Sequence, residues 1–162
     1  MNWGECQVSE WQGAPQMETG APMPGIASDG RQLLVAYIVR DGGAVETFEE
    51  CYAVVSFSGV LQHTFGYPNE DVLSEHPLYS LGLEAYAFNE IANSPYVGEL
   101  AARNARAFPE SKARYLKHKH WIVTFHDETL EVVANAVEFL GTVGARSAVE
   151  AIEKMSNKTR EQ

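Results

Sequence analysis

Three of the five histidines lie in one short segment, at His118, His120 and His126. Alternation of apolar and polar residues predicts a strand over residues 119–127, and alternate residues of a strand share one face. His118 and His120 would lie about 7 Å apart and could chelate one divalent metal ion, whereas His118 and His126 would be about 26 Å apart. A solvated basic edge shared with the neighbouring lysines explains the pair without a metal. We favour that interpretation and expect no cofactor.

His126 and Asp127 lie at the end of the same expected strand. If a helix begins at Glu128, Asp127 can cap its N-terminus, where free N–H groups favour an anion. His126 could then act as a general acid or base, with His76 completing a small hydrolase site. Helix capping alone also explains the aspartate, and we favour that simpler interpretation.

The connection over residues 65–83 is long for a segment with so little expected regular structure. Connections of this length in compact domains often bind a ligand or a partner. Its aromatic, amide and imidazole groups suit a recognition surface. The candidate binding residues are Tyr67, Asn69, His76 and Tyr79. A packed loop with a one-turn helix is the structural alternative.

Charge is distributed unevenly along the chain. Its 22 acidic and 12 basic side chains give a net charge of −10. Residues 1–100 hold 14 acidic and two basic side chains, whereas residues 101–162 hold eight acidic and ten basic ones. The overall acidity argues against nucleic acid and anionic membranes as partners. The basic segment 103–120 instead predicts complementarity to the acidic half, within one chain or across a homodimer.

Composition predicts a globular protein of ordinary type. The chain of 162 residues is 45% hydrophobic and 21% charged, and its length predicts one domain. Cys6 and Cys51 have neither metal-site nor disulfide-framework spacing, which favours free thiols in a reducing compartment. We find no leader pattern and no apolar run long enough to span a bilayer. These features predict a cytoplasmic location without membrane attachment.

Sequence periodicity predicts an α+β fold with one small, mostly antiparallel sheet of about four strands and helices packed on one face. Residues 1–30 are expected to be an irregular lead-in whose degree of order is left open. Residues 31–156 are expected to form the domain, and residues 157–162 a frayed tail. The expected elements are strands at 32–39, 48–58, 60–65 and 119–127, and helices after Asn69, around 83–91, after Ser94-Pro95 and from Ser147 to about Met155.

Residues 128–140 fit two structures. Their apolar residues Leu130, Val133 and Val137 recur at helical spacing, and Gly141 could end a helix. This pattern favours an amphipathic helix, with a second hairpin strand as the alternative.

Known catalytic motifs are absent. The chain has no GxGxxG, Walker, HExxH, EF-hand or GxSxG pattern, and spacing alone assembles no nucleophile–base pair. The sequence therefore favours a non-catalytic interaction or ligand-binding module, acting on a protein partner or a small molecule. The alternative is a small hydrolase that uses His126 and Asp127 with a residue of the 65–83 connection, with or without a divalent metal ion.

Overall fold

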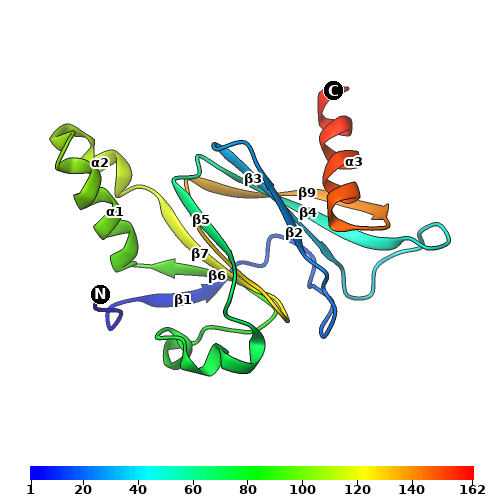
Figure 1. Cartoon of the computed structure of the whole chain (residues 1–162), viewed down its shortest axis with the longest axis horizontal. Coiled ribbons are helices and arrows are strands. Elements are labelled where there is room, and N and C mark those ends of the chain that lie inside the picture. The colour runs from blue at the N-terminus through cyan, green and yellow to red at the C-terminus, as the bar shows by residue number, and fades with distance from the viewer. The chain divides into compact units, whose positions relative to one another are not determined.

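The computed structural model describes all 162 residues, and the chain divides into two compact units (Figure 1). The first unit comprises Met1–Trp11 and Leu61–Ala136, and the second unit comprises Gln12–Val60 and Val137–Gln162. The α+β class is confirmed. However, the strands form two antiparallel sheets, of five and four strands, instead of one sheet of about four.

The first unit is built on the five-stranded sheet, in the order β1-β6-β7-β8-β5. Its strands are β1 (Gln7–Glu10), β5 (Gln62–Gly66), β6 (Phe88–Ala92), β7 (Lys119–Thr124) and β8 (Thr129–Ala134). Strand β7 is buried on both faces, since every residue after Lys119 is buried. A tight turn joins β7 to β8, in which the N–H of Phe125 donates to the carbonyl of Glu128 at 2.9 Å.

Short helices complete the first unit (Figure 1). They are the 3₁₀ helices η1 (Glu70–Glu75), η2 (Tyr79–Leu81) and η3 (Pro109–Ser111), and the α-helices α1 (Pro95–Ala105) and α2 (Lys112–Tyr115). The segment that contains η1 and η2 packs on one face of the sheet. Its leucines Leu73, Leu78 and Leu83 form an apolar cluster with Ile91 and Ile122. The 65–83 connection therefore packs against the sheet through this apolar cluster.

The second unit is a four-stranded sheet with one helix on its face (Figure 1). Its elements are β2 (Gly25–Ser28), β3 (Gln32–Ile38), β4 (Glu50–Ser58), β9 (Ala136–Ala145) and α3 (Ala148–Arg160), with strand order β2-β3-β4-β9. Helix α3 begins where the Ser147 hydroxyl accepts the N–H of Glu150 at 3.2 Å. Its apolar side chains pack on the sheet around Tyr52 and Val54.

Several predicted elements are confirmed, and others need an adjusted boundary. The strands expected at 32–39, 48–58, 60–65 and 119–127 correspond to β3, β4, β5 and β7, and a helix follows Ser94-Pro95. Helix α3 continues to Arg160, beyond the expected end near Met155 and into the tail that was expected to be frayed. The lead-in over residues 1–30 contributes β1 and β2.

Two predicted helices are wrong. Residues 83–91 contain strand β6, and residues 128–140 form β8 and the start of β9, so the hairpin alternative holds. Five of the six residues of β8 are buried, on both faces of the strand. A strand covered on both sides is apolar throughout, and its residues therefore match helical spacing as well. Asp127 consequently lies in a hairpin turn and caps no helix.

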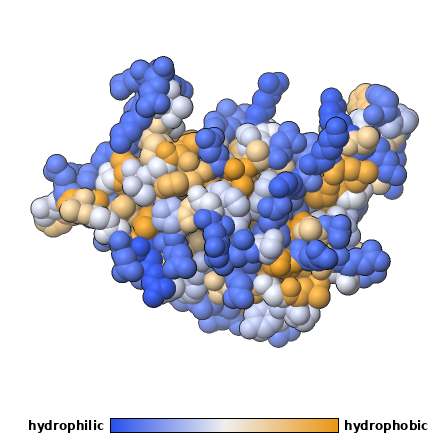
Figure 2. Space-filling view, turned by 180° about the vertical axis from the view of Figure 1, so that it is seen from behind, coloured by the Kyte–Doolittle hydropathy of each residue, from blue (hydrophilic) through white to orange (hydrophobic).

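None of the helices combines the length and the apolar character needed to cross a membrane. One face of the molecule is mainly hydrophilic, with apolar residues in small, separate patches (Figure 2).

Candidate active site

Three side chains of the first unit form a continuous hydrogen-bonded chain. Ser94 Oγ lies 2.7 Å from Nδ1 of His120, and Nε2 of His120 lies 2.7 Å from Oε1 of Glu131. A hydroxyl, an imidazole and a carboxylate joined in this order are the parts of a serine hydrolase triad.

Strand pairing brings the three residues together. His120 of β7 pairs with Ile91 of β6, and Ser94 follows the end of β6 as the N-cap of α1. On the other side of β7, Glu131 of β8 pairs with Ile122, which is two residues from His120. Side chains two residues apart in a strand share one face. Glu131 is therefore the diagonal neighbour of His120. The end of β6, strand β7 and strand β8 thus position Ser94, His120 and Glu131, respectively.

His120 has no exposed side-chain surface. Its ring has two aromatic neighbours, with centroid distances of 6.3 Å to Trp3 and 5.6 Å to Tyr96. The expectation of a solvated edge at His120 is therefore wrong, because the face of β7 that carries it is covered. Both ring nitrogens are engaged, by Ser94 and Glu131, and neither is left for a metal ion.

The state of Glu131 determines the direction of these hydrogen bonds. Burial disfavours its carboxylate, but the hydrogen bond from His120 and the nearby imidazoles of His120 and His76 lower the pKa of Glu131 overall. An ionised carboxylate only accepts hydrogen bonds, so Nε2 of His120 carries a proton. In the neutral imidazole Nδ1 is then the acceptor, and the Ser94 hydroxyl donates to it. This is the tautomer that a general base at Nδ1 requires.

Ser94 occupies a helix N-cap position without capping the helix. Its hydroxyl accepts no hydrogen bond from the backbone of α1. The first N–H groups of a helix have no partner within it. Pro95 has no N–H, so the donors left at this helix end are those of Tyr96 and Val97.

A cavity of about 520 Å³ opens beside Ser94. Ser94 is partly exposed and lines this cavity together with Val97, Leu116, Lys117 and His118. The preceding residue, Asn93, has a φ of +56°, in the left-handed region that asparagine adopts more readily than most residues other than glycine. The cavity volume is in the range of small-molecule sites.

His76 belongs to the surroundings of His120. Its Nδ1 accepts the backbone N–H of Leu78 at 3.1 Å. Burial lowers the pKa of His76; the charge of Glu131 raises it, and that of His120 lowers it further. These electrostatic interactions place His76 near the buried imidazole of His120 and the partly exposed carboxylate of Glu131.

His126 makes a separate cluster on the surface of the first unit. Its Nδ1 lies 2.9 Å from Oε2 of Glu70 and 2.9 Å from the Tyr86 hydroxyl, which donates to the same Glu70 oxygen at 2.6 Å. The hydrogen bond to Glu70 raises the pKa of His126, and hydrogen bonds from Tyr86 and His126 lower the pKa of Glu70. Asp127 lies farther away, at 3.9 Å from Nε2. The 65–83 connection thus contacts His126 through Glu70.

The remaining candidate residues are spread over the first unit. Tyr67 is 83% exposed and Tyr79 is 50% exposed, whereas the buried Oδ1 of Asn69 has no hydrogen-bond partner. His118 lies just before β7, with Nδ1 3.0 Å from the carbonyl of Tyr115. No group of three or more histidine, cysteine or acidic side chains is arranged to hold a metal ion.

Sequence reasoning missed Ser94 and Glu131 as site residues. Ser94 has the sequence signature of a helix cap, and Glu131 lies in the polar stripe of the helix expected over 128–140. A strand assignment for residues 129–134 would have placed Glu131 beside β7. No family model, curated protein or solved structure matches this chain.

Proposed function

We propose that the first unit is a serine-dependent hydrolase that cleaves carboxylic esters or related acyl compounds. One observation carries the proposal: the Ser94 hydroxyl is hydrogen-bonded to a buried imidazole that a carboxylate holds from the other side. The spacing of residues in the sequence does not predict this combination of serine, histidine and glutamate. The proposal keeps the hydrolase class considered from the sequence but assigns it to different residues.

The reaction follows the usual two acyl-transfer steps. Ser94 Oγ attacks the substrate carbonyl carbon while its proton passes to Nδ1 of His120. The tetrahedral intermediate expels the alcohol, which takes that proton, and an acyl–Ser94 ester remains. Water then attacks this ester, with Nδ1 accepting one proton, and a carboxylic acid leaves as Ser94 regains its hydrogen.

The other groups have supporting roles. Glu131 orients the imidazole and stabilises its protonated form, so it is a positioning residue. The uncapped N–H groups of Tyr96 and Val97 are the donors available to an oxyanion, and the positive end of the helix dipole favours that charge. The rings of Trp3 and Tyr96 exclude water from His120, which strengthens these interactions.

A non-catalytic binding module is the second candidate. Tyr67 and Tyr79, which are mostly or half exposed, lie on the 65–83 connection together with the partly exposed Phe65. Exposed aromatic side chains are common in interfaces. That function makes no use of the Ser94 hydroxyl, and the two proposals therefore predict different effects of its removal.

The test is hydrolysis of a series of p-nitrophenyl esters of increasing acyl length by the full chain. Ser94→Ala should lower kcat by at least about a thousand-fold, as removal of a nucleophile does. Ser147→Ala is the matched control, because Ser147 is also a helix N-cap but has no histidine partner. The unfolding midpoint of each variant confirms that it is folded. Equal turnover by Ser94→Ala and the parent protein contradicts the proposal.

A further inference from the structure

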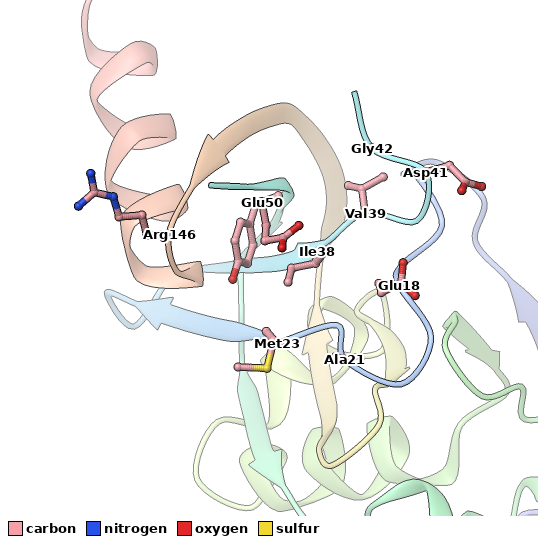
Figure 3. A pocket seen from close by; sticks show the side chains of 10 residues that line it. Glu18, Ala21, Met23, Ile38, Val39, Asp41, Gly42, Glu50 and Arg146 are labelled. Carbon is pink, nitrogen blue, oxygen red and sulfur yellow. The ribbon is translucent and has the colours of Figure 1, made fainter. Parts of the chain in front are cut away.

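The second unit contains a cavity that the hydrolase proposal does not use. Its volume is about 600 Å³, and it lies beside the ends of β3 and β4 (Figure 3). The cavity is lined by both charged and apolar side chains. The residues that matter for its chemistry are Glu18, Met23, Ile38, Glu50, Tyr52 and Arg146.

The carboxylates of this cavity have no cationic partner. Neither Glu18 nor Glu50 forms an ion pair, although four other carboxylates of the chain pair with lysine or arginine. Arg146 and Asp41 also line the cavity, but their side chains point outward at opposite ends of it, while Glu18 and Glu50 lie between them, around Ile38 (Figure 3). The central part of the cavity therefore carries two negative charges.

Tyr52 adds a polar group that has no hydrogen-bond partner within the chain. The residue is only 3% exposed and lines the cavity, and its hydroxyl makes no hydrogen bond within the chain. Burial, together with the charge of Glu50, raises the pKa of Tyr52. Tyr52 lines the cavity, and a ligand bound there can supply a hydrogen-bond partner.

Backbone strain is present at the same place. Met23 and Asp41 have φ values of +43° and +53°. A left-handed conformation is costly for Met23, whereas aspartate adopts it more readily.

We propose that this cavity binds an aliphatic diamine or a polyamine. Two ammonium groups balance Glu18 and Glu50, and one of them can donate a hydrogen bond to the Tyr52 oxygen. The methylene chain between them lies against Ile38 and Met23, which form an apolar surface. A single divalent metal ion does not fit, because these carboxylates do not converge into a metal-binding group.

The test is calorimetric titration of the full chain with putrescine and spermidine at moderate salt, with n-butylamine and Mg²⁺ as comparison ligands. We expect saturable one-site binding of the diamine and weaker binding of the monoamine. Glu18→Gln and Glu50→Gln should each weaken putrescine binding at least ten-fold. Tyr52→Phe should weaken it less, because the aromatic ring is kept.

Glu46→Gln is the matched control, because Glu46 is exposed, carries the same charge and does not line the cavity. It should leave putrescine binding unchanged. A chain of net charge −10 attracts polyamines without any site. Equal weakening by Glu46→Gln, equal affinity for Mg²⁺, or no binding of putrescine would overturn the proposal.

Discussion

The hydroxyl of Ser94 is hydrogen-bonded to Nδ1 of His120 at 2.7 Å, although Ser94 occupies the N-cap position of α1. Ser147 occupies the same position in α3 and caps its helix through the N–H of Glu150. The two serines therefore have the same local position and different partners. Their comparison separates the capping role of a serine from the role proposed at the candidate active site.

Removal of the Ser94 hydroxyl and removal of the Ser147 hydroxyl should each destabilise the protein, but for different reasons. Ser147→Ala loses a helix cap, at a cost of about 1 kcal/mol. Ser94→Ala leaves Nδ1 of the buried His120 without a partner, at a cost of about 1–3 kcal/mol. Urea unfolding measures both values. A cost near zero for Ser94→Ala would show that its hydroxyl is dispensable to His120.

Glu131→Gln should lower kcat for ester hydrolysis by about 10²- to 10⁴-fold, because the amide no longer holds the required tautomer of His120. KM should change little, since Glu131 does not line the cavity beside Ser94. The unfolding midpoint must show that Glu131→Gln is folded, because a loss of folded enzyme would also lower the apparent kcat without changing KM. A large rise in KM with unchanged kcat would contradict a positioning role.

The same carboxylate should make stability depend on pH in acid. The folded-state pKa of Glu131 is lower than its ordinary value of 4.5. The carboxylate therefore stabilises the fold above pH 4.5, and this contribution is lost as the pH falls through the lowered value. Glu131→Gln should flatten the dependence of the unfolding free energy on pH in that window. An unchanged pH dependence would count against an ionised Glu131.

His126 should titrate above its ordinary pKa of 6.5, because its hydrogen bond to Glu70 favours the protonated ring. The stabilising effect is fully present below pH 6.5 and is lost as the pH rises through the higher folded-state value. In NMR titrations, Glu70→Gln should lower the His126 pKa. Asp127→Asn should lower it less, because Asp127 lies 3.9 Å away. The reverse order of these two effects would show that Asp127 is the main partner.

Gly25→Ala should destabilise the second unit by about 1–3 kcal/mol through overpacking. A Cβ atom at Gly25 would lie 2.7 Å from the Cβ of Ala148 at the start of α3. Ala148→Gly removes the opposing methyl group, and the double variant should recover part of the loss. Thermal unfolding of the three variants tests this contact, and strictly additive losses would argue against it.

The sequence predicted local structure where one pattern excluded the others. Strands β3, β4 and β7 were found from alternation or continuous apolar runs, and α1 from its Ser94-Pro95 start. Strand β8 was missed because burial on both faces makes its apolar residues fit a helix as well. Because of that error, Glu131 was not expected beside β7, and Asp127 was interpreted as a helix cap.

Local sequence patterns could not predict the candidate active site. Ser94 and His120 are 26 residues apart, and His120 and Glu131 are 11 residues apart. Their contact depends on the pairing of β6, β7 and β8, which periodicity does not specify. Two lysines of the basic segment 103–120, Lys117 and Lys119, line the cavity beside Ser94.

Covalent labelling distinguishes an activated serine at position 94 from an ordinary helix N-cap serine. The full chain is treated with a fluorophosphonate probe, which phosphonylates activated serines, and the adduct is located by peptide mass spectrometry. We expect one adduct on Ser94, its loss in His120→Asn, and no adduct on Ser147. A folded protein that remains unlabelled at Ser94, or one in which Ser94 and Ser147 react equally, would contradict it.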